Sequence, residues 1–149
     1  MTLYLEHLAE GDHLESNRLT VTEAHIVQFA GLTGDFNPLH MDDTFARQGP
    51  FGQRIAHGML SYSLSTGMRS AIDDWAILAF METGRRFVAP VFPGDTLHYQ
   101  AVVASVRRSR SNPSRGIVQV TLRLLNQNDQ VVQEGTDTFA VASQEQVSA

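Results

Sequence analysis

The segment GMLSYSLSTGM, from Gly58 to Met68, sets the architecture that we expect for this chain. Its apolar side chains are spaced as in a helix, and no charged residue occurs in it before Arg69. A helix without charges over this length is buried on most sides. We therefore expect one helix at the centre of the fold rather than on its surface.

The chain changes character after this helix and becomes rich in Val, Leu, Phe and Thr. Turn residues separate the segments at Pro93-Gly94-Asp95, at Asn112-Pro113 and between Asn126 and Asp129. We expect successive antiparallel strands over residues 76–81, 85–88, 96–108, 116–125 and 131–141. A buried helix followed by such a meander predicts an α+β fold, with a curved antiparallel sheet wrapped around a central helix.

A second helix is expected before the central one, followed by a loop. Thr20 and Glu23 have the spacing of a capping box, so this helix should begin near Val21. The pair Asn37-Pro38 favours extended or turn geometry, because the residue before proline is pushed out of the helical region. We therefore expect residues 35–41 to form a shaped loop.

Composition limits the class of protein. The 149 residues are 42% hydrophobic, which suits a single domain over 1–149 with a core of about residues 10–142. There is no cysteine, hence no disulfide and no thiolate metal site, and cofactor-free chemistry is the simpler expectation. The N-terminus lacks a signal-peptide pattern and no apolar run is long enough to cross a bilayer, so we expect a cytoplasmic protein without a membrane partner.

The charge balance argues against nucleic acid as a partner. The formal net charge is −5, and every basic residue other than histidine is arginine. Arginine nevertheless suits local contacts with phosphate groups, because its planar fork matches them.

Two further segments carry candidate chemistry: FAGLTGDFNPLH, from Phe29 to His40, and IAHGML, from Ile55 to Leu60. The spacing of Asp35 and His40 would not place both side chains on one face of a helix. The turn at Asn37-Pro38 can fold the backbone so that both side chains reach one water molecule.

These segments, together with FVAPVFPGD from Phe87 to Asp95, resemble the signature of the (R)-specific enoyl-CoA hydratases and MaoC-like dehydratases. The resemblance extends from about Thr20 to Phe139 and is weakest at both ends. It implies a hot-dog fold and a homodimer, or a larger even-numbered assembly, with a tunnel at the dimer interface. It also implies a lyase of fatty acid metabolism that hydrates trans-2-enoyl-CoA to (3R)-hydroxyacyl-CoA and runs in reverse as a dehydratase.

The hydration chemistry assigns roles to particular residues. Adding water to a 2-enoyl thioester needs a base for the water, a proton for C2 and a donor for the thioester oxygen. We assign Asp35 as the base, His40 as the group that holds the same water and passes a proton toward C2, and the backbone N–H of Gly58 as the donor. The addition is then syn, and no metal or cofactor is required, since coenzyme A is part of the substrate. Substrate contacts are expected from Asn37, His57, Met59 and Thr66, the last at a position where similar proteins often have a hydroxyl near the catalytic aspartate.

Each of these residues also has a simpler interpretation. The segment around Asp35 has the composition of an ordinary turn, and His57 is a structural histidine in the simpler reading. Asp35 and His40 are also common metal ligands, but no third ligand has a recognised spacing. Six arginines are candidates for holding coenzyme A phosphates or an acidic carrier protein, although a solvated strand end is the better interpretation for any single one: Arg85, Arg86, Arg107, Arg108, Arg110 and Arg115.

Three other functions remain open. One is dehydration of (3R)-hydroxyacyl groups on acyl carrier protein, or of a branched or dicarboxylic acyl-CoA. Another is a non-catalytic hot-dog protein that binds acyl thioesters, and a third is a hot-dog thioesterase. Bulky candidates for limiting the acyl chain length are Tyr62, Trp75, Phe80 and Phe87.

Overall fold

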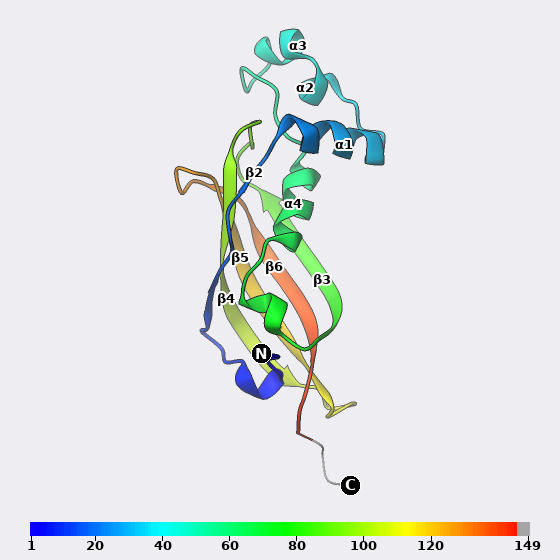
Figure 1. The fold of residues 1–149 in the computed structure, drawn as a ribbon, viewed down its shortest axis with the longest axis vertical. Helices are drawn as coiled ribbons and strands as arrows, with labels where there is room; N and C mark the ends of the chain where they lie inside the picture. The colour runs from blue at the N-terminus through cyan, green and yellow to red at the C-terminus, as the bar shows by residue number, and fades with distance from the viewer. Residues whose placement is uncertain (146–149) are drawn as a thin grey trace.

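The computed structural model describes residues 1–145 and contains one twisted antiparallel sheet with a helix packed against it (Figure 1). The strands are β1 His13–Glu15, β2 Leu19–Thr20, β3 Ile77–Phe87, β4 Thr96–Arg108, β5 Arg115–Leu125 and β6 Val131–Ala142. The helices are α1 Glu23–Thr33, α2 Pro38–Met41, α3 Asp43–Arg47 and α4 Gly58–Gly67, with 3-10 turns at Leu5–His7 and Ala71–Asp74. The α+β class with few helices is as predicted.

The strand order is β1-β4-β5-β6-β3, and β2 pairs with the start of β4. Strands β4, β5 and β6 form the predicted meander, within one residue of the predicted bounds. Strand β3 precedes β4 in the chain but does not pair with it. It pairs with β6, so the last strand of the chain lies inside the sheet. The short strand β1 was not predicted, since three residues give too little alternation to recognise.

The two strands predicted over 76–81 and 85–88 are one strand, β3. The residues between them continue the ladder with β6, since Glu82 pairs with Thr138 and Gly84 with Thr136. Strand β3 tolerates these polar residues and the glycine because it lies at the edge of the sheet.

The core lies between the sheet and α4. Alternate residues of the central strands are fully buried, as expected when one face of a sheet covers the core. In β4 and β5 these are Leu97, Tyr99, Ala101, Val103, Val118, Val120, Leu122 and Leu124. Burying a Val or Leu side chain in this way stabilises the fold by about 1.5–3 kcal/mol relative to leaving it exposed.

Helix α4 was expected to be buried on most sides, and within the chain this is wrong. Leu60, Ser61 and Ser65 are buried, whereas Met59 is 52% exposed and Ser63 is exposed. The helix thus buries one face against the sheet and leaves the other open in a single copy of the chain.

Helix α1 begins later than predicted. Its N-cap is Thr22, whose hydroxyl accepts the backbone N–H of His25, while Thr20 lies in β2 and pairs with Thr96. The capping box predicted at Thr20 and Glu23 lies two residues downstream, at Thr22 and His25, so histidine takes the place of glutamate. The helix ends at Gly34, which has φ of 81°, a conformation that favours glycine.

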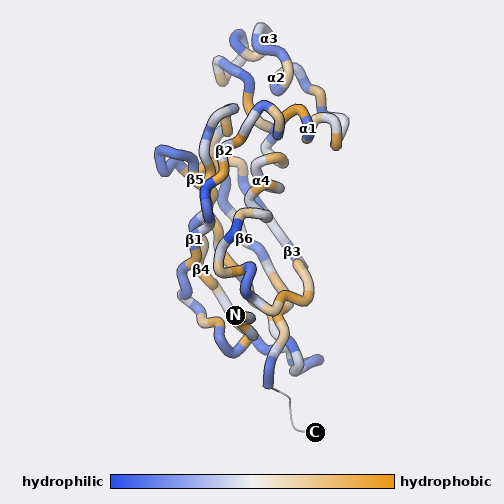
Figure 2. Tube along the Cα trace, in the orientation of Figure 1, coloured by the Kyte–Doolittle hydropathy of each residue, from blue (hydrophilic) through white to orange (hydrophobic). Residues whose placement is uncertain are grey.

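Strand β3 lies at an edge of the sheet, and the start of the strand is hydrophobic (Figure 2). In and just after the strand, the exposed apolar residues are Ile77, Leu78, Phe80, Met81, Phe87 and Val88. An edge of this kind is a site for pairing with another chain. Among residues 1–145, no helix has the length and hydropathy needed to span a membrane.

Candidate active site

Asp35 directly follows Gly34, whose left-handed conformation ends α1. The backbone N–H of Asp35 donates to the hydroxyl of Thr33 at 3.2 Å. Within residues 1–145 its carboxylate accepts only the backbone N–H of Asn37, also at 3.2 Å, and the side chain is 51% exposed. The carboxylate therefore keeps free lone pairs for a reacting water.

His40 lies on a short helix rather than in a continuous loop, which corrects the prediction for residues 35–41. Asn37 caps α2 by accepting the N–H of Leu39 at 3.0 Å, and Pro38 occupies the first helical position, where proline is favoured. One turn of helix places His40 on the same side as Asp35, with its side chain buried. The extended geometry predicted for Asn37 is present, since its ψ is 133°.

The protonation pattern of the His40 ring follows from its neighbours. Nδ1 lies 2.7 Å from the carbonyl oxygen of Ile55, and a carbonyl can only accept, so Nδ1 is the donor. This fixes Nε2 as the nitrogen that exchanges protons. Nε2 faces Asp35, 3.9 Å from its Oδ2.

A separation of 3.9 Å is too long for a direct hydrogen bond and suits one bridging water. If a water lies about 2.8 Å from both atoms, the angle at its oxygen between Oδ2 and Nε2 is about 90°. This is compatible with the roughly tetrahedral arrangement of the hydrogens and lone pairs of water. Asp35 and His40 are therefore placed to hold a single water between them.

Gly58 begins α4, next to this pair. The first backbone N–H groups of a helix have no acceptor within it and carry partial positive charge. A side chain at this position would meet the ring of Phe87 at 3.1 Å, so glycine lets that ring pack closely against the start of α4. The carbonyl of Gly58 accepts from the side chain of Gln133 at 2.9 Å, which fixes the start of α4 to β6.

A cavity of about 230 Å³ joins these groups. It is lined by Phe29, Thr33, Asp35, His40, His57, Gly58 and Met59. A larger cavity of about 520 Å³ shares Gly58 and Met59 with it and is mostly apolar, with walls that include Phe51, Phe87 and Pro90. The predicted residues Asp35, His40, His57, Gly58 and Met59 are thus brought together.

Thr66 is not brought to Asp35 within the chain. It lies two turns along α4 from Gly58, about 12 Å at 1.5 Å per residue, and its hydroxyl donates to the carbonyl of Ser63. It lines a separate cavity of about 460 Å³ together with Trp75 and Phe80. The resemblance carried this residue over by position alone, so its predicted contact with the catalytic aspartate is absent from this chain.

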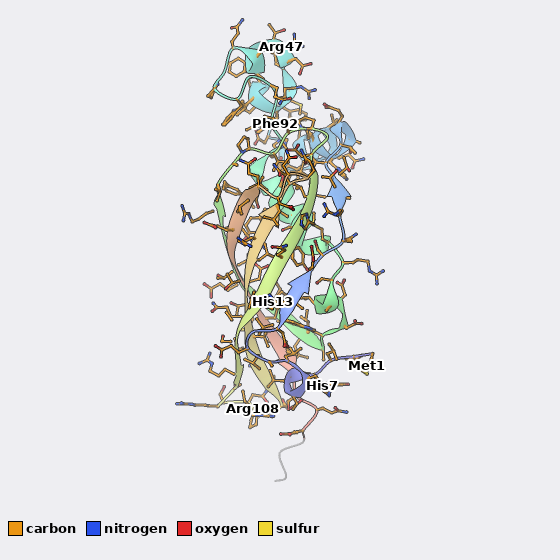
Figure 3. The ribbon with its side chains drawn as sticks, turned by 90° about the vertical axis from the view of Figure 1, so that its left-hand side faces the viewer. Met1, His7, His13, Arg47, Phe92 and Arg108 are labelled. Carbon is orange, nitrogen blue, oxygen red and sulfur yellow. The ribbon has the colours of Figure 1, made fainter. Side chains whose placement is uncertain are left out.

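Three of the arginines considered for phosphate binding form ion pairs with acidic residues of the chain. Arg85 is buried in an ion pair with Asp137 at 2.7 Å, and Arg86 lies 3.4 Å from Glu134. Arg108 lies at the end of the molecule opposite Arg47 of α3 (Figure 3).

Among residues 1–145, Asp35, His40 and His57 form the one group of three potential metal ligands that lie close together, within 4.8 Å. Nε2 of His57 is already committed to the carbonyl oxygen of Asp35 at 2.9 Å. The third potential ligand that the sequence did not supply is therefore a histidine whose Nε2 is engaged and whose Nδ1 has no partner among the described residues, and the absence of a metal requirement stays a prediction.

Arg54 is a residue beside the site that the sequence analysis missed. Its guanidinium donates to both carboxylate oxygens of Glu23, to Asp43 at 2.5 Å and to the backbone carbonyl of His40 at 3.3 Å. It thereby ties α1 and α3 to the short helix that bears the histidine. These contacts lower the pKa of Asp43 and raise that of Arg54. The sequence gives no sign of these contacts, because Glu23 and Asp43 lie far from Arg54 along the chain and such spacings form no recognisable motif.

Comparison with known proteins agrees with this arrangement. A family model described as a MaoC like domain matches residues 7–124. A 3-hydroxybutyryl-CoA dehydratase of Methylorubrum extorquens is 33% identical over 72% of this chain and 71% of its own length. An (R)-specific enoyl-CoA hydratase of Aeromonas caviae is 33% identical over 70% of this chain and 74% of its own. Protein MaoC of Klebsiella aerogenes is 39% identical over 63% of this chain but is far longer, and the match spans 28% of it.

Solved structures support the fold. The MaoC-like dehydratase of Rhodospirillum rubrum superposes with a TM-score of 0.84 at 32% identity, covering 97% of this chain and 99% of that one. A Mycobacterium tuberculosis protein described as a double hot-dog fold gives a TM-score of 0.80 at 16% identity, over 99% of this chain and 47% of its own. The predicted hot-dog fold is confirmed.

Proposed function

We infer, from the premise that this chain belongs to the MaoC-like domain family, that it catalyses the reversible (R)-specific hydration of trans-2-enoyl-CoA to (3R)-hydroxyacyl-CoA. One observation carries the proposal. Asp35 Oδ2 and His40 Nε2 flank a position for one water, in a cavity that also reaches the start of α4 at Gly58.

The reaction follows from these positions. Asp35 accepts a proton from the water as the water oxygen bonds to C3 of the enoyl group. The electrons of the double bond move toward C2 and the thioester carbonyl, whose oxygen gains negative charge. The backbone N–H of Gly58 donates to that oxygen, assisted by the positive end of the helix dipole.

His40 completes the addition. The carbonyl of Ile55 keeps a hydrogen on Nδ1, so His40 must enter the step with a second hydrogen, on Nε2. Nε2 gives this proton to C2 on the same side as the water, which leaves His40 neutral. Addition is therefore syn. The proton taken by Asp35 returns to His40 through the next water molecule, and both groups regain their starting state.

The substrate contacts are proposed from the lining of the two joined cavities. Met59 is exposed toward both and would contact the acyl thioester. Asn37, which lines neither cavity, contributes by capping α2. A cytoplasmic location and independence of metals and other cofactors belong to the same proposal.

A homodimer, or a larger even-numbered assembly, is the proposed state of the enzyme. The exposed apolar residues of β3 and its free edge support it, because an isolated chain would leave both in contact with water. Pairing there would also cover part of the open face of α4.

The experiment is a panel of trans-2-enoyl-CoA chain lengths, followed by the loss of conjugated-enoyl absorbance with a chelator present. We expect hydration of crotonyl-CoA or a somewhat longer homologue, with mainly the (3R) product by chiral analysis. Mainly (3S) product, activity abolished by the chelator, or release of free coenzyme A would each count against the proposal. Parallel assays with (3R)-hydroxyacyl groups on acyl carrier protein distinguish the two carriers.

A further inference from the structure

We propose that His57 is a positioning residue, which holds Asp35 and His40 in the geometry that lets them share one water. The proposal rests on the proposed function and extends it to a side chain that would touch neither the water nor C2. Its basis is the juxtaposition of the His57 imidazole with the backbone of one catalytic residue and the ring of the other.

The first contact is a tether on Asp35. Nε2 of His57 lies 2.9 Å from the backbone carbonyl oxygen of Asp35, and since a carbonyl only accepts, Nε2 is the donor. In the described part of the chain the carboxylate of Asp35 has a single hydrogen bond, and it is half exposed. Its position is therefore set mainly by where the backbone is held, and His57 holds that backbone against the start of α4.

The second contact is with His40. The two imidazole rings stack with centroids 3.9 Å apart and planes inclined by 29°. The hydrogen bond to Ile55 fixes one end of the His40 ring, and the stack fixes the plane in which Nε2 points toward Asp35. The edge of Phe29, 5.1 Å away, packs on His57 and supports this orientation.

A role in helix stability accounts poorly for these contacts. His57 is the N-cap of α4, yet its side chain makes no capping hydrogen bond. Ser, Thr, Asp or Asn would cap the helix at this position. The side chain is instead buried and directed away from the helix end, with Nδ1 unpartnered among the described residues. A buried imidazole that gives its one donor to the carbonyl of the catalytic aspartate acts on the site rather than on the helix.

The test separates the tether from the stack. His57→Phe keeps an aromatic ring for stacking and removes the donor, whereas His57→Gln keeps a donor and removes the ring. We expect His57→Phe to lower kcat by about tenfold to a hundredfold, the scale of a misplaced catalytic group, with KM changed by less than about threefold. His57→Gln should retain more of kcat than His57→Phe. His13→Phe, an exposed histidine on β1, is the matched control and should keep parental kcat.

The decisive readout is coupling to Asp35. If His57 acts through Asp35, adding His57→Phe to Asp35→Asn should lower kcat by less than about twofold further. The same fold loss in both backgrounds would assign His57 a general structural role and overturn the proposal, as would parental kcat in His57→Phe. If Asp35→Asn itself keeps parental turnover, the water-activating pair of the proposed function is wrong and the positioning role is lost with it.

A second measurement does not depend on the variants folding. Nitrogen-15 NMR of the histidine side chains in the parent protein should show the hydrogen of neutral His57 on Nε2. Finding that hydrogen on Nδ1 would remove the tether and overturn the proposal.

Discussion

Replacing Arg54 with alanine should loosen the segment that carries His40. The guanidinium is 19% exposed and joins Glu23 and Asp43, whose side chains are 56% and 60% exposed. Taking the pair with Glu23 at about 0.2–1 kcal/mol, and toward the upper end because the arginine is better shielded, this pair contributes up to about 1 kcal/mol to the free energy of unfolding. For a domain of this size its loss corresponds to a fall in Tm of up to about 4 °C.

The same change should lower turnover by a factor of about 3 to 10, because the carbonyl of His40 loses a donor and the helix that bears the imidazole is held less firmly. Calorimetry and steady-state hydration assays measure the two effects. Arg47→Ala on α3 is the matched control, since it removes an exposed arginine without removing the contacts to Glu23 or His40.

The stabilisation by Arg54 should depend on salt and on pH. In 1 M salt the difference in Tm between parent and Arg54→Ala should shrink, because screening weakens exposed ion pairs. Arg54 lowers the pKa of Asp43 from its ordinary value of 3.8, so this contribution is fully present above that pH and is lost as the pH falls through the lower folded value. Equal Tm and equal turnover for parent and Arg54→Ala at neutral pH and low salt would refute the reasoning.

Three further predictions concern other parts of the molecule. Met81→Glu on the exposed edge of β3 should shift the mass measured by light scattering toward the monomer and lower activity; a parent that is already monomeric and fully active would contradict this. Gln133→Leu should lower kcat by about tenfold, because the start of α4 loses its hydrogen bond to β6, and unchanged kinetics would show that Gly58 is held by other contacts. A hydrogen bond from Ser143, with Arg108 assisting, lowers the pKa of Glu6 to about 2, so the stability that Glu6 contributes is present above pH 4.5 and is lost as the pH falls toward 2. Acid titration of Glu6→Gln should lack that part of the loss.

The fold was predictable from sequence where period and turns agree. Strands β4, β5 and β6 alternate apolar and polar residues between clear turn signals, and their bounds were predicted to within a residue. The pairing of β3 with β6 was not predictable, because the order of strands depends on contacts between residues far apart in the chain. The exposed face of α4 was mispredicted for a related reason, since an uncharged helix has the same sequence whether it is covered by its own chain or by another.

The site was predictable as a set of residues rather than as a geometry. The motif brought Asp35, His40, His57 and Gly58 to attention, and the structure gathers them around one cavity. The roles of Ile55 and Arg54 could not be predicted, because a backbone carbonyl and a long-range ion pair leave no pattern along the chain.

The most direct test of the central claim is the hydration rate of Asp35→Asn beside that of the parent. Asparagine keeps the size of aspartate and can still accept the N–H of Asn37, the one hydrogen bond made by the carboxylate, so Tm should be unchanged within about 1 °C. It cannot take a proton from water, so kcat should fall by about a hundredfold or more. An Asp35→Asn protein that melts like the parent and hydrates enoyl-CoA at a near-parental rate would contradict the assignment of Asp35 and His40 as the water-activating pair.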